Sequence, residues 1–156
     1  MSREAIAQQH GPQSLNRVAL SATLHCLTGC GIGEVLGLVI ASTLGWDVPP
    51  SLVLAVVLAF FFGYSLTIRP LLGGGLPLVR AVRTALAADT LSIIVMEIVD
   101  NAVILVVPGA MEAGVADALF WGSLAFALAI AFVATFPVNR WLIARGRGHA
   151  LVHGHH

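Results

Sequence analysis

The sequence predicts an all-α integral membrane protein, a four-helix bundle with both chain termini on the cytoplasmic side (N-in/C-in). Only 10% of its residues are charged, 58% are hydrophobic, and the mean hydropathy is +0.91. Soluble domains are far more polar than this. Four apolar runs have the length of ~20 residues that a helix needs to cross a bilayer. The lipid bilayer is therefore the first expected partner.

The four spans are expected at about 18–44, 51–68, 78–107 and 118–143. They form one transmembrane domain, 18–143, between a polar cytoplasmic lead, 1–17, and a His-rich cytoplasmic tail, 144–156. Pro70 is expected to end the second span, because proline has no N–H to continue the hydrogen-bond ladder. Asn139, just after Pro137 in the fourth span, is expected to cap backbone carbonyls that this proline frees.

The placement of arginine sets the expected orientation. The chain has no lysine, and its eight arginines lie before the first span, between the second and third, and after or near the end of the fourth. The charged residues of the other two connections are all acidic: Asp47, Glu112 and Asp117. The positive-inside rule then places both termini in the cytoplasm, and we expect a multi-pass protein of a bacterial inner membrane.

The most informative stretch is the first span, where Cys26, Cys30 and Glu34 follow one another at intervals of four residues. This spacing places them on one side of a helix. A glycine row lies beside them at Gly29, Gly33 and Gly37, and such rows are typical of close helix packing in membranes. We expect this row either to pack within the chain or to form a homodimer.

The third span carries a polar stripe of its own. Its carboxylates have no basic residue at similar depth, and an unpaired charge at mid-bilayer costs at least ~2.5 kcal/mol. Comparison of depths along the first and third spans predicts two polar layers. The inner layer holds His25, Cys26, Cys30, Asp89 and Ser92, and the outer layer holds Glu34, Met96, Glu97, Asp100 and Asn101. We assign an ion or proton path to Asp89, Ser92, Glu97 and Asp100. The alternative for Asp100 is that it lies near the outer surface and is simply solvated.

The cysteine pair indicates a metal site. Cβ atoms four residues apart on a helix are ~5–6 Å apart, too far for an unstrained disulfide, whereas one metal can join two thiolates at ~2.3 Å each. The expected ligand set is Cys26, Cys30, His25, Met96 and Glu34. These ligands favour copper as Cu(I), with zinc possible. The alternatives are that the cysteines are ordinary core residues and that His25 hydrogen-bonds a carbonyl.

The tail holds four histidines that either capture metal ions loosely or have no role: His149, His153, His155 and His156. Net charge is zero, so no basic footprint indicates a nucleic-acid partner. No phosphate-binding loop, dinucleotide fingerprint or catalytic triad pattern is present.

Three motifs carry a resemblance to a known family: His25-Cys26-x-x-Gly29-Cys30-x-x-Gly33-Glu34, Ala88-Asp89-Thr90-Leu91-Ser92 with Glu97, and Pro137-Val138-Asn139-x-Trp141-Leu142-Ile143. On these residues the chain resembles a family of short, four-span bacterial inner-membrane proteins catalogued as a domain of unknown function. The resemblance implies no settled activity. It looks like a family sometimes found with copper-handling proteins, which favours copper.

Together these observations favour a membrane metal-binding protein, a transporter or carrier component for a soft cation, over two other classes. One is an enzyme, a membrane thiol–disulfide oxidoreductase, which would need thiolates within reach of a partner. The other is a structural subunit of a larger membrane complex.

Overall fold

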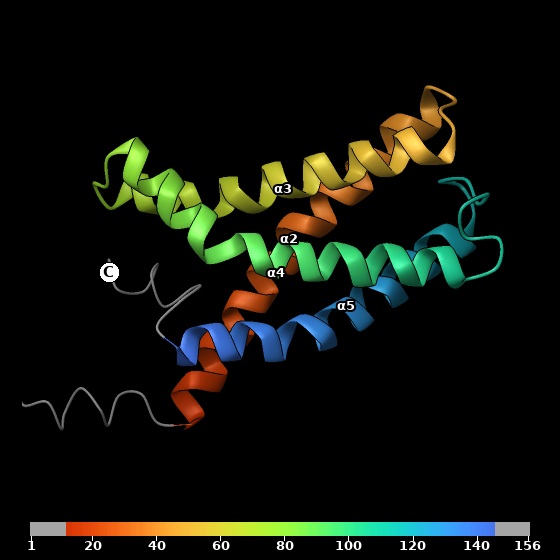
Figure 1. Ribbon diagram of the computed structural model, residues 1–156. Helices are drawn as coiled ribbons and strands as arrows, with labels where there is room; N and C mark the ends of the chain where they lie inside the picture. Colours follow the sequence, from red (N-terminus) through yellow and green to blue (C-terminus); the bar gives the residue numbers. More distant parts are fainter. Residues whose placement is uncertain (1–11, 146–156) are drawn as a thin grey trace, which may run out of the picture.

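The computed structural model describes residues 12–145, and in this part of the chain it contains four α-helices and no strand. The helices are α2 (Pro12–Thr43), α3 (Val48–Gly73), α4 (Leu78–Val106) and α5 (Ala118–Ala144). They alternate in direction, so the α2–α3 and α4–α5 connections lie at one end of the molecule (Figure 1). The predicted all-α fold with four helices is confirmed.

Short turns with specific residues end and restart the helices. Gly45 closes the α2–α3 turn with φ of +66°, a conformation that side chains with a Cβ rarely adopt. Asp47 is the N-cap of α3, and a proline stands in its first turn, where a missing N–H costs nothing. The α2–α3 and α3–α4 connections, residues 44–47 and 74–77, are so short that the helices they join must lie side by side, whereas the α4–α5 connection, residues 107–117, is longer.

Helix α3 continues through Pro70 to Gly73, past the point at which we expected the second span to end. Pro70 lies in the last turn, where its missing N–H removes only one intrahelical bond. The N–H of Gly74 donates to the Pro70 carbonyl at 2.9 Å and closes the helix. The prediction treated proline as a stop, but so near a helix end it is tolerated.

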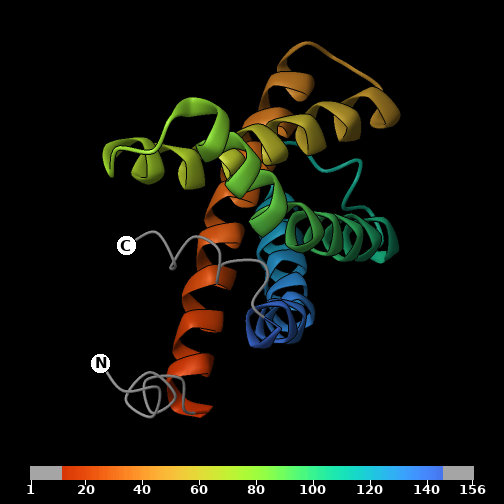
Figure 2. The same cartoon turned by 60° about the vertical axis from the view of Figure 1, so that its left-hand side comes forward.

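Helix α2 crosses the other helices obliquely instead of running parallel to them (Figure 2). The close contact between α2 and α3 is made by the glycine row. A Cβ on Gly29 would lie 2.7 Å from Cα of Gly63, and a Cβ on Gly37 would lie 2.5 Å from Cα of Ala55. A Cβ on Gly33 would overlap the backbone of Ala59.

The glycine row therefore faces α3 of the same chain, and its glycines are buried. The surface on which we placed a homodimer is occupied within the chain, because a small-residue row packs against whichever helix can approach it most closely. The homodimer through Gly29, Gly33 and Gly37 stays a prediction, and it would require α2 to exchange its contact with α3 for one with a second copy.

Large apolar side chains cover the outside of the molecule. Val53, Phe61, Ile98 and Val133 are all more than half exposed, which suits contact with lipid. Among the described residues, α2 (from Leu15), α3 and α5 are long and apolar enough to cross a membrane. The chain is therefore a helical membrane protein.

Helix α4 is not among these three, although its 29 residues give it the length to cross. Arg80 and Arg83 lie in its first two turns, and three acidic residues are buried along its inner face. These charges lower its hydropathy. Its outward face still carries exposed Leu91, Ile94 and Ile98. A fourth span at α4, like the N-in/C-in orientation, stays a prediction.

Candidate functional site

The inner face of α4 is polar along its length. Its buried residues include Asp89, Ser92, Met96, Glu97 and Asp100. Asp100 is only 1% exposed, so the alternative that it is merely solvated at the membrane surface is wrong. A helix that turns carboxyl groups inward and leucines outward is typical of a membrane protein with a functional interior.

Opposite this face, α2 places both thiols in the core. Cys26 and Cys30 are free, 3% and 0% exposed, and their Sγ atoms are 3.8 Å apart. They share one buried cluster with Met96, Ile93 and two small residues, Ala59 and Ala131. We call Cys26, Cys30 and Met96 the sulfur cluster. The structure therefore places Met96 with the thiols, whereas the depth comparison had placed it in the outer polar layer.

Glu34, one helical turn beyond Cys30, belongs to a second group. Its carboxyl group lies close to that of Asp100 and near that of Glu97. Glu97 in turn interacts with the Cys30 thiol. We call Glu34, Glu97 and Asp100 the carboxyl cluster. Through Glu97 it adjoins the sulfur cluster, so the thiols and the acids form one continuous interior site.

The carboxyl cluster is poor in hydrogen-bond donors. Among the described residues, neither oxygen of Glu34 or Asp100 has a hydrogen-bond partner, nor does Oε1 of Glu97. Asn101 donates to Oε2 of Glu97 at 3.4 Å. An ionised carboxylate that is buried without hydrogen-bond donors is strongly disfavoured. Such a group is instead protonated, neutralised by a bound cation or hydrated by water. This is the arrangement expected of an ion or proton site.

A hydrogen-bonded network closes the site toward the chain termini. Ser92 donates to Oδ1 of Asn139, and Asn139 Nδ2 donates to Oγ1 of Thr23 at 3.0 Å. Thr23 donates to the Ala19 carbonyl. Asn139 thus joins α5 to α4 and α2, and the expectation that it caps carbonyls near Pro137 is wrong. Sequence reasoning did not find Thr23, since one threonine in an apolar helix gives no signal.

Replacing Asn139 with alanine is expected to lower the free energy of unfolding by about 1–3 kcal/mol, because two buried hydroxyl groups lose their partner. Asn16→Ala is the matched control. Asn16 also hydrogen-bonds a helix α5 residue, Arg140, but on the exposed surface, and its loss should change stability by less than about 0.5 kcal/mol. Denaturation in mixed micelles measures both, and equal losses would show that the buried network adds nothing.

The remaining predicted ligands lie elsewhere. His25 Nε2 and Oγ1 of Thr67 in α3 are 2.9 Å apart and hydrogen-bonded. Within residues 12–145, no three His, Cys, Asp or Glu side chains are grouped so that they could hold a metal ion. The structure thus brings Met96 to the thiols but does not assemble His25 or Glu34 with them in such a group. The four tail histidines, at 149, 153, 155 and 156, lie outside the described residues.

Fold and site together define a small helical membrane protein with a thiol- and acid-lined interior. The chain belongs to the family described as "Domain of unknown function (DUF4396)", whose model matches residues 15–148. This range includes all of the candidate site, and it confirms the resemblance to a family of unknown function. No curated protein and no solved structure matches the chain.

Proposed function

We propose that this protein binds a soft cation within the membrane and carries it across, alone or as a component of a larger carrier, with Cu(I) favoured over Zn(II). We place it in a bacterial inner membrane with both termini in the cytoplasm. The observation that carries the proposal is the pair of buried Sγ atoms 3.8 Å apart on one helix face, beside a thioether and carboxyl groups without donors.

The sulfur geometry suits one bridging metal. With metal–sulfur bonds of ~2.3 Å, two sulfur atoms 3.8 Å apart subtend an angle of about 110° at the metal. That angle fits tetrahedral coordination and requires no movement of the helix backbone. Met96 is the nearest further soft donor because it lies in the same buried cluster. Thiolate and thioether ligands select Cu(I) among biological cations.

The carboxyl cluster supplies the protonation chemistry that such binding requires. Thiols must lose their protons to bind a metal, and Glu97, which interacts with Cys30, is placed to accept one. Glu34 and Asp100 continue the path away from the thiols on one side, and Asp89 and Ser92 extend it on the other. In this proposal these side chains form an acidic path along the middle of the bundle interior.

A thiol–disulfide oxidoreductase is less well supported. Its thiolate must be reached by a partner, and here both thiols are at most 3% exposed. A purely structural subunit would need neither the thiol pair nor the donor-free carboxyl groups.

The test is a titration of the detergent-purified protein with Cu(I), and separately with Zn(II), under reducing conditions. All four tail histidines are replaced by alanine, so that the tail contributes no binding. We expect one Cu(I) per chain, held more tightly than Zn(II), and no binding after Cys26→Ser/Cys30→Ser. Stoichiometric Cu(I) binding that persists in the double variant would refute the proposal.

Met96→Leu tests the third ligand, because leucine keeps the volume and removes the sulfur. We expect weaker Cu(I) binding with little change in stability. Met111→Leu is the matched control: Met111 lies in the α4–α5 connection, away from the sulfur cluster, and its replacement should leave the affinity unchanged. Equal affinities in both variants would remove Met96 from the ligand set.

A further inference from the structure

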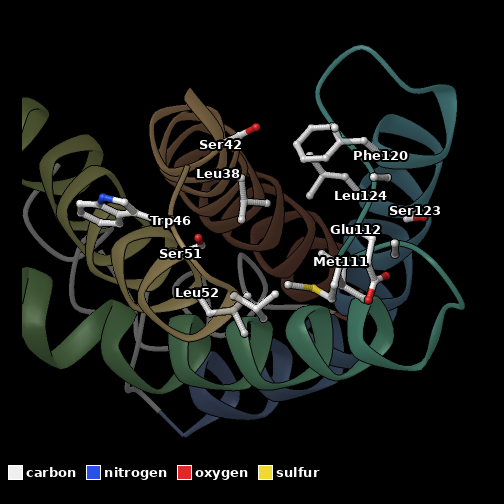
Figure 3. Close-up of a pocket in the computed structure, with 15 residues that line it drawn as sticks. Leu38, Ser42, Trp46, Ser51, Leu52, Met111, Glu112, Phe120, Ser123 and Leu124 are labelled. Carbon is white, nitrogen blue, oxygen red and sulfur yellow. The ribbon is translucent and has the colours of Figure 1, made fainter. Parts of the chain in front are cut away.

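A partly open cavity lies at the end of the molecule where α2 finishes and α3 and α5 begin. It has a volume of about 210 Å³ and is lined by parts of all four helices and by the α4–α5 connection. In Figure 3, Leu38 of α2 and Phe120 and Leu124 of α5 project into it. Nothing in the proposed metal site uses this cavity.

The floor of the cavity is one helical turn from the carboxyl cluster. Leu38 follows Glu34 by four residues in α2, and Ile104 follows Asp100 by four residues in α4, so each lies over its acidic neighbour on the same helix face. Four residues advance a helix by ~6 Å. Leu38 and Ile104 both line the cavity and pack in one apolar cluster. They are therefore the barrier between the cavity and the Glu34–Asp100 pair.

One polar group in the cavity lacks a partner. Ser123 lines the cavity from α5 and is 6% exposed, and its Oγ has no hydrogen bond among the described residues. A buried hydroxyl is normally paired with protein or water. Because the Ser123 hydroxyl has no such partner in the protein, the space next to it suits water or a hydrated ligand.

The charge around the cavity favours a cation. Glu112 lines it, and the same end of the molecule carries exposed Asp47 and Asp117. The described arginines lie in the first turns of α2 and α4 or in the last turns of α3 and α5, all at the opposite end. Acidic groups at the mouth of a cleft raise the local concentration of cations.

We propose that this cavity is a loading vestibule, in which a hydrated metal cation rests beside Ser123 before it passes Leu38 and Ile104 to reach the Glu34–Asp100 pair. This inference rests on the proposed function, because it supplies the route between the thiol site and one face of the membrane. Leu38 and Ile104 act as a hydrophobic gate, which keeps the carboxyl cluster dry until a cation passes.

Thiol labelling tests the vestibule without any metal. In the full chain carrying Cys26→Ser/Cys30→Ser, Ser123→Cys places a new thiol in the cavity. Each labelling rate is divided by the rate of the same reagent with a free thiol in solution. On this scale we expect the new thiol to react at least tenfold faster with trimethylammonium-ethyl methanethiosulfonate than with the negatively charged sulfonate analogue. Thr135→Cys is the control, because Thr135 is also buried and unpartnered but lies about 18 Å further along α5, away from the cavity. It should not react.

Ser51→Cys, also in the cavity wall, repeats the test should Ser123→Cys fail to fold. Absence of labelling at a folded cavity position, or equal rates with both reagents, would overturn the vestibule. Labelling at position 135 as fast as at 123 would show general looseness and would also overturn it.

The gate has its own test. In the same Cys26→Ser/Cys30→Ser protein, the thiol of Glu34→Cys should not react with the trimethylammonium reagent while Leu38 and Ile104 are present. Leu38→Ala or Ile104→Ala opens the floor and should raise its labelling rate at least tenfold. Ready labelling with both gate residues intact would refute the gate. These results are independent of Cu(I) binding. Loss of labelling with retained copper binding removes only the vestibule. Cation-selective labelling without copper binding would remove the proposed function and, with it, the loading role, and would leave only a cavity that cations can enter.

Discussion

Gly33→Ala is expected to destabilise the protein by about 3 kcal/mol, the upper part of the range for overpacking a close-packed interior. The added Cβ would overlap the backbone of Ala59 and the Leu58 carbonyl carbon, and backbone atoms cannot rotate aside as a side chain can. The α2–α3 contact would have to open along its length. In a membrane the loss is severe, because close packing is a main source of helix association there.

Gly31→Ala is the matched control for this prediction. It lies two residues away in the same helix, and its new Cβ would meet only the Cδ1 atom of Leu128, at 3.7 Å. Since alanine is a better helix former than glycine by up to ~1 kcal/mol, this variant should be as stable as the wild type or slightly more so. Unfolding of both in mixed micelles measures the difference. Similar stabilities would show that the glycine row does not hold α2 to α3.

Much of the fold could be predicted because apolar length and turn residues act locally. Gly45 and the Asp47–Pro50 segment end α2 and start α3 through their own backbone preferences. The face shared by Cys26, Cys30 and Glu34 follows from helix geometry alone. These features need no knowledge of which helices meet.

What could not be predicted depends on contacts between helices. The sequence does not say that the glycine row meets α3, because the small residues opposite it, Ala55, Ala59 and Gly63, are common in any apolar helix. Depth along a straight span placed Met96 with the outer acids. Because α2 crosses the bundle obliquely (Figure 2), residues at equal distances along two helices do not meet, and Met96 packs with the cysteines instead.

The carboxyl cluster, too, could be predicted in part from single residues, whereas its contacts depend on how the helices pack. Its members were expected from the cost of unpaired acids in a membrane, which each residue carries by itself. That Glu34 lies beside Asp100, and Glu97 beside Cys30, depends on how α2 packs on α4 and could not be predicted from the sequence. The same holds for the role of Asn139, whose partners are 47 and 116 residues away. Under the proposed function, the thiols, Glu97 and the Glu34–Asp100 pair would be the groups through which a proton leaves as a metal arrives.

The second large effect is expected from Glu34→Gln and from Asp100→Asn. Each replacement keeps the size of the side chain but exchanges its titratable carboxyl group for an amide that stays neutral. Reconstituted into liposomes, each variant should transport Cu(I) about a hundredfold more slowly than the wild type, the lower end of what a positioned proton-transfer group contributes. Equilibrium Cu(I) affinity in detergent should change little, because the thiols remain.

Glu112→Gln is the comparison variant, because it removes an acidic group from the exposed wall of the vestibule and leaves the buried carboxyl cluster intact. It should slow transport only slightly, and less at high salt, since surface charges act through a screened field. A Glu34→Gln protein that transports at the wild-type rate would show that the carboxyl pair carries no proton. A parallel loss of binding and transport would instead make Glu34 a ligand, and would move the metal from the sulfur cluster toward Asp100.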